Sequence, residues 1–154
     1  MDDFSTKRLP VGPDAIAPDG SDVRILLGLA GGSMAHFELA PGETSIAVAH
    51  RTVEEIWFFL GGRGEMWRKQ DGREEVVSVD PGVCITIPRA THFQFRSFSR
   101  QPLTALGVTM PPWPGEGEAY PVEGTWQPTV RPRSDESIKR SLGISGFLLG
   151  PLQA

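Results

Sequence analysis

Apolar runs of strand length recur along the chain, and turn residues bound each of them. Between residues 23 and 110 these runs are VRILLGLA, MAHFELA, SIAVAH, IWFFL, GEMWRK, EVVSV, VCITI, HFQFRS and LTALGVTM. None of them sustains the period of about 3.6 residues that marks an amphipathic helix, so each is predicted to be a β-strand. Asp71 and Gly72 indicate a tight hairpin between two of the runs. The pattern predicts an all-β chain folded as an antiparallel sandwich or barrel.

The segments on either side of these runs are rich in proline. Residues 1–22 are predicted to form an extended N-terminal arm that leads into a barrel over 23–110. The segment 111–154 begins with many prolines, which argue against a regular central strand. Its part from Trp113 to Trp126 is expected to form a strap over the barrel or a lid across its mouth. One short helix is predicted over 134–143, and the whole chain is expected to form a single domain.

Composition narrows the function classes. The 154 residues carry a net charge of −4, and the basic residues are scattered, so nucleic acid is not an expected partner. No apolar stretch reaches the length of a membrane span or of a signal-peptide core, so a soluble, cytoplasmic protein without a membrane partner is expected. Cys84, the single cysteine, lies in an apolar run and is predicted to be a buried, unreactive thiol in a reducing compartment.

One stretch resembles the first motif of the cupin family, which reads Gly, five residues, His, one residue, His, three or four residues, Glu, six residues, Gly. Here Gly42 opens the motif, and Val48 stands where the first histidine belongs. His50 occupies the second histidine position and Glu55 the glutamate position. The closing glycine matches Gly61 or Gly62.

A later stretch resembles the second cupin motif. Gly82 and Pro88 have the family spacing, Ala90 replaces a glycine, and His92 comes one residue early. No asparagine follows at the last motif position. The resemblance covers roughly residues 30–110 and implies a double-stranded β-helix, the jelly-roll barrel of cupins.

The resemblance also implies a divalent transition metal in the barrel, with Fe, Mn, Zn, Ni or Cu as candidates. His50, Glu55 and His92 would then form a two-histidine, one-carboxylate set. His50 and Glu55 are five positions apart, so they converge only if the chain turns between them. The alternative is a barrel without metal, in which His92 is one polar residue on the polar face of a strand.

Other side chains are candidates for contact with a substrate. Trp57 should face the barrel interior if Glu55 does, although core packing is the commoner role of such a residue. Gln94, Arg96 and Arg68 could present donors to an anionic or carbonyl-bearing substrate, and exposed arginines on a sheet are an equal alternative. His36 could replace the missing ligand only if its face of the strand points inward.

The same alternation points Ile56, Phe58 and Leu60 out of the barrel. An outward row of large apolar side chains needs a cover. The cover could be the proline-rich arm or a second subunit, and a homodimer through this face is predicted.

Three hypotheses for function follow. The first is a metal-dependent cupin enzyme that acts on a small organic molecule by dioxygenation, isomerisation, decarboxylation or lyase chemistry. The second is a cupin without metal or catalysis that binds a sugar or small organic acid. The third is a structural protein that associates through its outer face. The fold alone does not choose among them.

Overall fold

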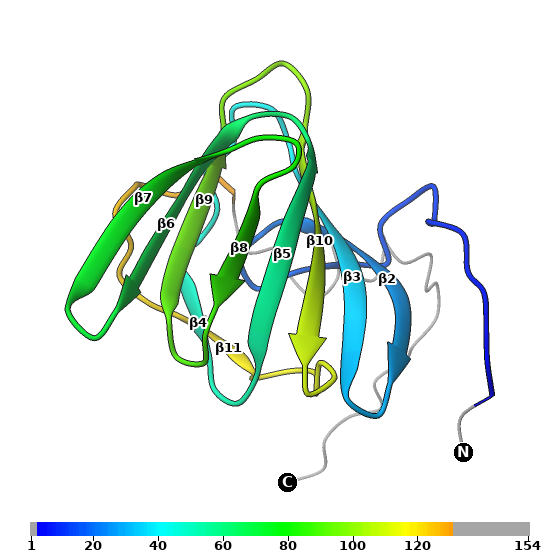
Figure 1. Cartoon of the computed structure of the whole chain (residues 1–154). Coiled ribbons are helices and arrows are strands. Elements are labelled where there is room, and N and C mark those ends of the chain that lie inside the picture. Colours follow the sequence, from blue (N-terminus) through cyan, green and yellow to red (C-terminus); the bar gives the residue numbers. More distant parts are fainter. Residues whose placement is uncertain (1–2, 131–154) are drawn as a thin grey trace, which may run out of the picture.

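Two antiparallel β-sheets face one another in the computed structural model, which describes residues 3–130 (Figure 1). The first sheet has six strands in the order β1-β2-β3-β10-β5-β8, and the second has five in the order β11-β4-β9-β6-β7. The strands are β1 (Ala15–Ile16), β2 (Asp22–Leu29), β3 (Gly32–Leu39), β4 (Val48–His50), β5 (Glu54–Gly61), β6 (Gly64–Gln70), β7 (Arg73–Val79), β8 (Cys84–Ile87), β9 (His92–Ser97), β10 (Leu103–Met110) and β11 (Ala119–Pro121).

Each predicted apolar run overlaps one of these strands, so the all-β prediction is confirmed. At the β6–β7 hairpin, Asp71 and Gly72 have φ angles of 47° and 79°, as a two-residue hairpin turn requires. The structure adds two short edge strands, β1 in the predicted arm and β11 in the proline-rich segment. The helix predicted at 134–143 lies outside the described residues. Within residues 3–130, no helix is long and apolar enough to span a membrane.

Strand β5 shows how alternation builds the core. Its residues Glu55, Trp57 and Phe59 are buried, whereas Ile56 and Phe58 are 41% and 44% exposed. The predicted inward and outward faces of this strand are therefore confirmed. The apolar core between the sheets consists of Leu39, Val48, Trp57, Phe59, Met66, Val79, Ile85, Ile87, Phe93, Phe95, Leu103 and Ala105.

The prediction of a buried thiol at Cys84 was wrong, because this side chain is exposed. In β8 the side chains of Ile85 and Ile87 point into the core, which turns Cys84 and Thr86 outward. Cys84 lies opposite Phe58 of β5 on the outer face of the first sheet. An apolar run does not reveal which of its two faces is buried, and that ambiguity caused the error.

After edge strand β11, residues 124–126 pass over the outer face of the second sheet and are held there by the side-chain amide of Gln94. Gln94 Nε2 donates to the carbonyl oxygens of Ser45 and Trp126, each at 2.8 Å. Its Oε1 accepts from the backbone N–H groups of Thr125 and Trp126 at 3.0 and 2.9 Å. This part of the proline-rich segment is thus a strap, and the hydrogen bonds of Gln94 hold it against the sheet.

Replacement of Gln94 by alanine should cost about 2–4 kcal/mol of unfolding free energy, because four backbone groups lose their partner. Urea denaturation would measure this loss. The matched control is Gln101→Ala, which truncates an exposed glutamine. A Gln94→Ala variant as stable as that control would mean that the strap is held by other contacts.

Candidate functional site

A cavity of about 350 Å³ lies between the first sheet, the end of β4 and the segment that carries β1. Most of its wall is apolar. Phe37 and Trp57 stack in parallel with ring centroids 4.6 Å apart, and both line the cavity. Its polar side chains within the described residues are few: Asp19, Ser33, His50, Glu55 and Thr109.

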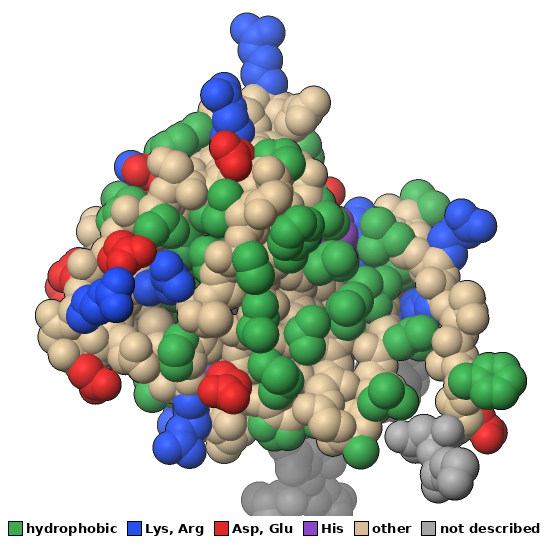
Figure 2. All heavy atoms as spheres, viewed as in Figure 1, with side chains coloured by type: hydrophobic (Ala, Val, Ile, Leu, Met, Phe, Trp, Pro, Cys, Tyr) green, Lys and Arg blue, Asp and Glu red, His purple; other side chains and the backbone are tan. Residues whose placement is uncertain are grey.

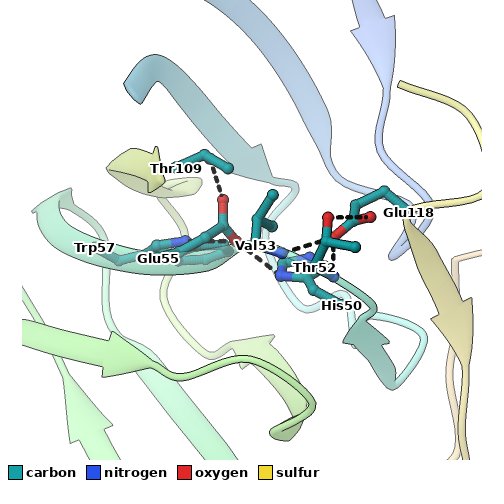
Figure 3. A network of polar contacts seen from close by, with 7 residues as sticks. All are labelled: His50, Thr52, Val53, Glu55, Trp57, Thr109 and Glu118. Atoms are coloured by element: carbon teal, nitrogen blue, oxygen red, sulfur yellow. Dashed lines mark hydrogen bonds and ion pairs between the residues drawn. The ribbon is translucent and has the colours of Figure 1, made fainter. Parts of the chain in front are cut away.

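The structure brings His50 and Glu55 together at this cavity (Figure 3). Strand β4 ends at His50, residues 51–53 turn, and β5 begins at Glu54. The turn places His50 Nδ1 3.5 Å from Glu55 Oε1. Two residues that would face opposite sides of one continuous strand therefore meet because the strand is interrupted.

Glu118 holds this turn in place. Its Oε1 accepts from the backbone N–H groups of Thr52 at 2.6 Å and Val53 at 2.8 Å, and its Oε2 accepts from the Thr52 hydroxyl at 2.9 Å (Figure 3). Burial opposes ionisation of Glu118, but these hydrogen bonds outweigh it and lower the pKa of the carboxyl below its usual range. The sequence gives no local sign of this role, because Glu118 lies 66 positions beyond Thr52.

Glu55 is a buried carboxyl in a mostly apolar wall, with 3% of its surface exposed. Its Oε2 accepts from the Thr109 hydroxyl at 2.5 Å, and its Oε1 accepts from Trp57 Nε1 at 3.4 Å. Burial raises the pKa of Glu55 to about 7, although both hydrogen bonds act in the opposite direction. A carboxyl with this pKa exchanges its proton near neutral pH.

The imidazole of His50 is buried between Phe93 and Trp113, whose rings approach it edge to face with centroids 5.3 Å away in each case. Burial lowers the pKa of His50 to about 4, against the opposing charge of Glu118. His50 is therefore neutral at pH 7. Its Nδ1 is buried and has no hydrogen-bond partner in the described structure.

Asp19 also lines the cavity, from the loop after β1. It is buried, and one carboxyl oxygen accepts from the backbone N–H of Ser21 at 2.8 Å and from the Ser21 hydroxyl at 2.6 Å. Burial raises the pKa of Asp19 in spite of these two hydrogen bonds. The sequence predicts only an extended arm around this residue, and part of that arm forms the cavity wall.

His92 does not join His50 and Glu55. Phe93 takes the inward position on β9, so His92 lies on the outer face, where it lines a surface pocket with Lys69 and Arg89. His36 also lies on an outer face, that of the first sheet, because its neighbour Phe37 lines the cavity.

The other candidate contacts are engaged elsewhere, except for Trp57. Gln94 anchors the strap. Arg96 pairs with Glu65 at 2.6 Å and lies over the ring of Trp126, with its guanidinium carbon 4.1 Å from the ring centroid. Arg68 donates to the Thr86 carbonyl oxygen at 2.8 Å and is not among the residues that line the cavity.

The donor set at the cavity differs from the metal centre implied by the sequence. Within residues 3–130, no group of three or more His, Cys, Asp and Glu side chains is gathered where it could hold one ion. Val48 is buried in the core at the position of the family's first histidine. The described residues therefore supply two donors, His50 Nδ1 and Glu55, and do not fit a centre with three or four protein ligands.

Comparison with known proteins agrees with the architecture. No protein-family profile and no curated protein matches the sequence. A conserved Klebsiella pneumoniae protein with a double-stranded β-helix domain aligns over 70% of this chain and 89% of its own, with 13% identity and a TM-score of 0.56. The chain has the cupin fold.

Two further solved structures share this cupin fold. Oxalate decarboxylase from Bacillus subtilis matches at 16% identity with a TM-score of 0.59, over 70% of this chain and 29% of the enzyme. That enzyme has Mn(II) centres. A Bacillus halodurans protein matches at 21% identity with a TM-score of 0.55, over 64% of this chain and 76% of its own. At these identities the likeness concerns the fold alone.

Replacement of Glu55 by glutamine should change how stability depends on pH. A folded-state pKa of about 7 against an ordinary value of 4.5 means that the folded protein holds this proton more tightly. The free energy of unfolding therefore falls as pH rises from 4.5 to 7, and the Glu55→Gln substitution removes that fall. Relative to the wild type, Glu55→Gln should gain roughly 2–3 kcal/mol between about pH 5 and about pH 8.

Chemical denaturation at several pH values measures this difference. The contribution of His50 is common to both proteins and cancels. Glu54→Gln, which removes the neighbouring exposed carboxylate, should show no such trend. A stability difference between Glu55→Gln and the wild type that stays constant with pH would contradict the assignment of a raised pKa to Glu55.

Proposed function

We propose that this cupin-fold chain binds a small organic molecule in the cavity, with the polar end of that molecule against His50 and Glu55. The observation that carries the proposal is the buried Nδ1 of His50, which lies 3.5 Å from Glu55 Oε1 in the cavity wall and has no hydrogen-bond partner among the described residues. A buried polar atom without a partner is rare and needs an explanation, and a bound polar group supplies one. The cavity volume lies at the lower end of the range of about 300–1,000 Å³ that is usual for ligand sites.

The pair also supports proton transfer to or from the bound molecule. Neutral His50 can accept a proton at Nδ1, and Glu55, with a pKa of about 7, can give or take one at neutral pH. Thr109 and Trp57 fix the carboxyl through their hydrogen bonds, so its orientation does not depend on the ligand. An acid-base enzyme and a binding protein would both use these contacts.

A metal-dependent enzyme whose ion has only two protein ligands is the second candidate, and one distance favours it. Donor atoms about 2.1 Å from a tetrahedral ion lie about 3.4 Å apart, close to the 3.5 Å between His50 Nδ1 and Glu55 Oε1. Water or the bound molecule would have to complete the coordination. A divalent metal in this position would supply Lewis-acid chemistry.

A fragment screen by thermal shift on the full chain tests the leading proposal. We expect fragments of one-ring size to raise the melting temperature and to bind about tenfold more weakly to His50→Ala, because a buried polar contact is lost. The control His92→Ala removes a histidine outside the cavity and should bind like the wild type. Absence of any stabilising fragment, or equal binding by His50→Ala, would refute the proposal.

Elemental analysis of the wild type, His50→Ala and His92→Ala would measure whether each protein carries a bound metal. Stoichiometric metal in the wild type and in His92→Ala but not in His50→Ala would favour the second candidate. Metal lost from both variants would instead support the three-ligand centre of His50, Glu55 and His92 that the sequence implied.

We further propose that the outer face of the first sheet joins two copies of the chain. Hydrophobic side chains gather over β5, β10 and β3 on this face (Figure 2). Met34, Ile56, Phe58 and Leu60 on it are each 38–44% exposed. Contiguous apolar patches of this kind on soluble proteins mark interaction sites.

The dimer is tested by sedimentation of the Phe58→Asp variant. Two buried carboxylates at a symmetric interface should convert a dimeric wild type into a folded monomer. Val76→Asp places the same charge on an exposed position of β7 in the other sheet and should leave the dimer intact. A monomeric wild type, or a dimer that persists in Phe58→Asp, would exclude this interface.

A further inference from the structure

We infer that the cavity takes a small organic cation, a primary ammonium group carried on an apolar body of about one ring. This inference rests on the proposed function and adds the chemical class of the ligand. It differs from the sugar or small organic acid that the sequence suggested as the ligand of a metal-free barrel. Three features of the described cavity lead to it: its charge, the two acceptor atoms at the pair, and its aromatic wall.

The cavity lining carries acidic side chains and no lysine or arginine among the described residues. Among the described residues that line it, none is lysine or arginine, and two are carboxylic acids, Asp19 and Glu55. Each of the two is buried, and neither forms an ion pair with a cationic lysine or arginine in the described structure. A buried carboxylate is stable only with a partner of opposite charge or with several hydrogen bonds. An anionic ligand would add a further negative charge, whereas an ammonium ion supplies the missing positive one.

Nδ1 of His50 lacks a hydrogen-bond donor, whereas the carboxyl of Glu55 already accepts from Trp57 and Thr109. With the imidazole proton on Nε2, Nδ1 of His50 is an acceptor, and the ionised carboxylate of Glu55 is an acceptor as well. These two acceptors face each other at 3.5 Å with no donor assigned to Nδ1. An ammonium group carries three N–H donors and no acceptor, so it can satisfy both atoms at once. A hydroxyl group has one proton and can satisfy only one of them.

The aromatic wall suits the same ligand. Trp57, Phe93 and Trp113 all line the cavity, and Phe93 and Trp113 flank the imidazole of His50. The face of an aromatic ring attracts a cation, more strongly where water is excluded. Most of the rest of the wall, which includes Leu26 and Ala35, offers apolar contact to the body of the ligand.

The charge class is tested with ligands of matched shape. Calorimetric titrations would compare benzylamine, benzyl alcohol and benzoate, and then the same three end groups on a cyclohexyl ring, at about pH 8, where Glu55 is mostly ionised. We expect the amine of each set to bind at least about tenfold more tightly than the alcohol, and the carboxylate to bind more weakly than both. Glu55→Gln should reduce amine affinity by about tenfold and leave alcohol affinity within about threefold.

Glu54→Gln, which removes an equal charge on the exposed side, is the control and should bind all ligands like the wild type. Alcohols or carboxylates that bind the wild type as tightly as the amines would overturn the inference and leave the proposed function standing. The inference would also fail if the fragment screen returned only uncharged or acidic ligands. Absence of binding by every ligand and fragment would refute both. The comparison among ligands uses the wild type, so it holds even if Glu55→Gln folds poorly.

Discussion

The carboxylate of Glu118 fixes the turn between β4 and β5, and the geometry of the candidate site depends on that turn. Strand alternation alone would send His50 and Glu55 to opposite faces. The hydrogen bonds from Thr52 and Val53 to Glu118 stabilise an interruption of the strand at residues 51–53, and the two side chains then face one another. Glu118 directly precedes β11. The segment of chain that leads into the strap therefore also holds the turn at the site.

Burial then gives the pair its chemistry. Removal from water makes the charged form of each group costly, so the pKa of Glu55 rises to about 7 and the pKa of His50 falls to about 4. At pH 7 His50 is neutral, whereas Glu55 is about half ionised. A cupin barrel with more histidines at this place would favour a metal ion, but here Val48 extends the apolar core instead. The barrel therefore has a cavity whose described residues offer fewer donors than a three-ligand metal centre needs.

Much of the fold could be predicted from the sequence, because alternation and turn chemistry are local. The strand β5 and the Asp71-Gly72 hairpin are examples. The site was predicted only in part. His50 and Glu55 lie near each other along the chain, whereas the contact of Glu118 with Thr52 spans 66 positions and leaves no local pattern.

Strand register explains most of the remaining differences between the predicted and the observed side-chain orientations. In the second cupin motif the histidine comes one residue early, and a shift of one residue turns a strand side chain to the opposite face. Phe93 accordingly points into the core and His92 points out. Cys84 was misplaced for a related reason, since every residue of its run except Thr86 is apolar and either face could have been the buried one.

A crystal structure of the full chain with benzylamine bound would test the role of the His50 and Glu55 pair most directly. We expect the ligand nitrogen within hydrogen-bond distance of both His50 Nδ1 and Glu55 Oε1, with the ring against Trp57 and Trp113. A ligand seated instead in the surface pocket beside Lys69 and Arg89, with His50 and Glu55 unchanged, would contradict the account.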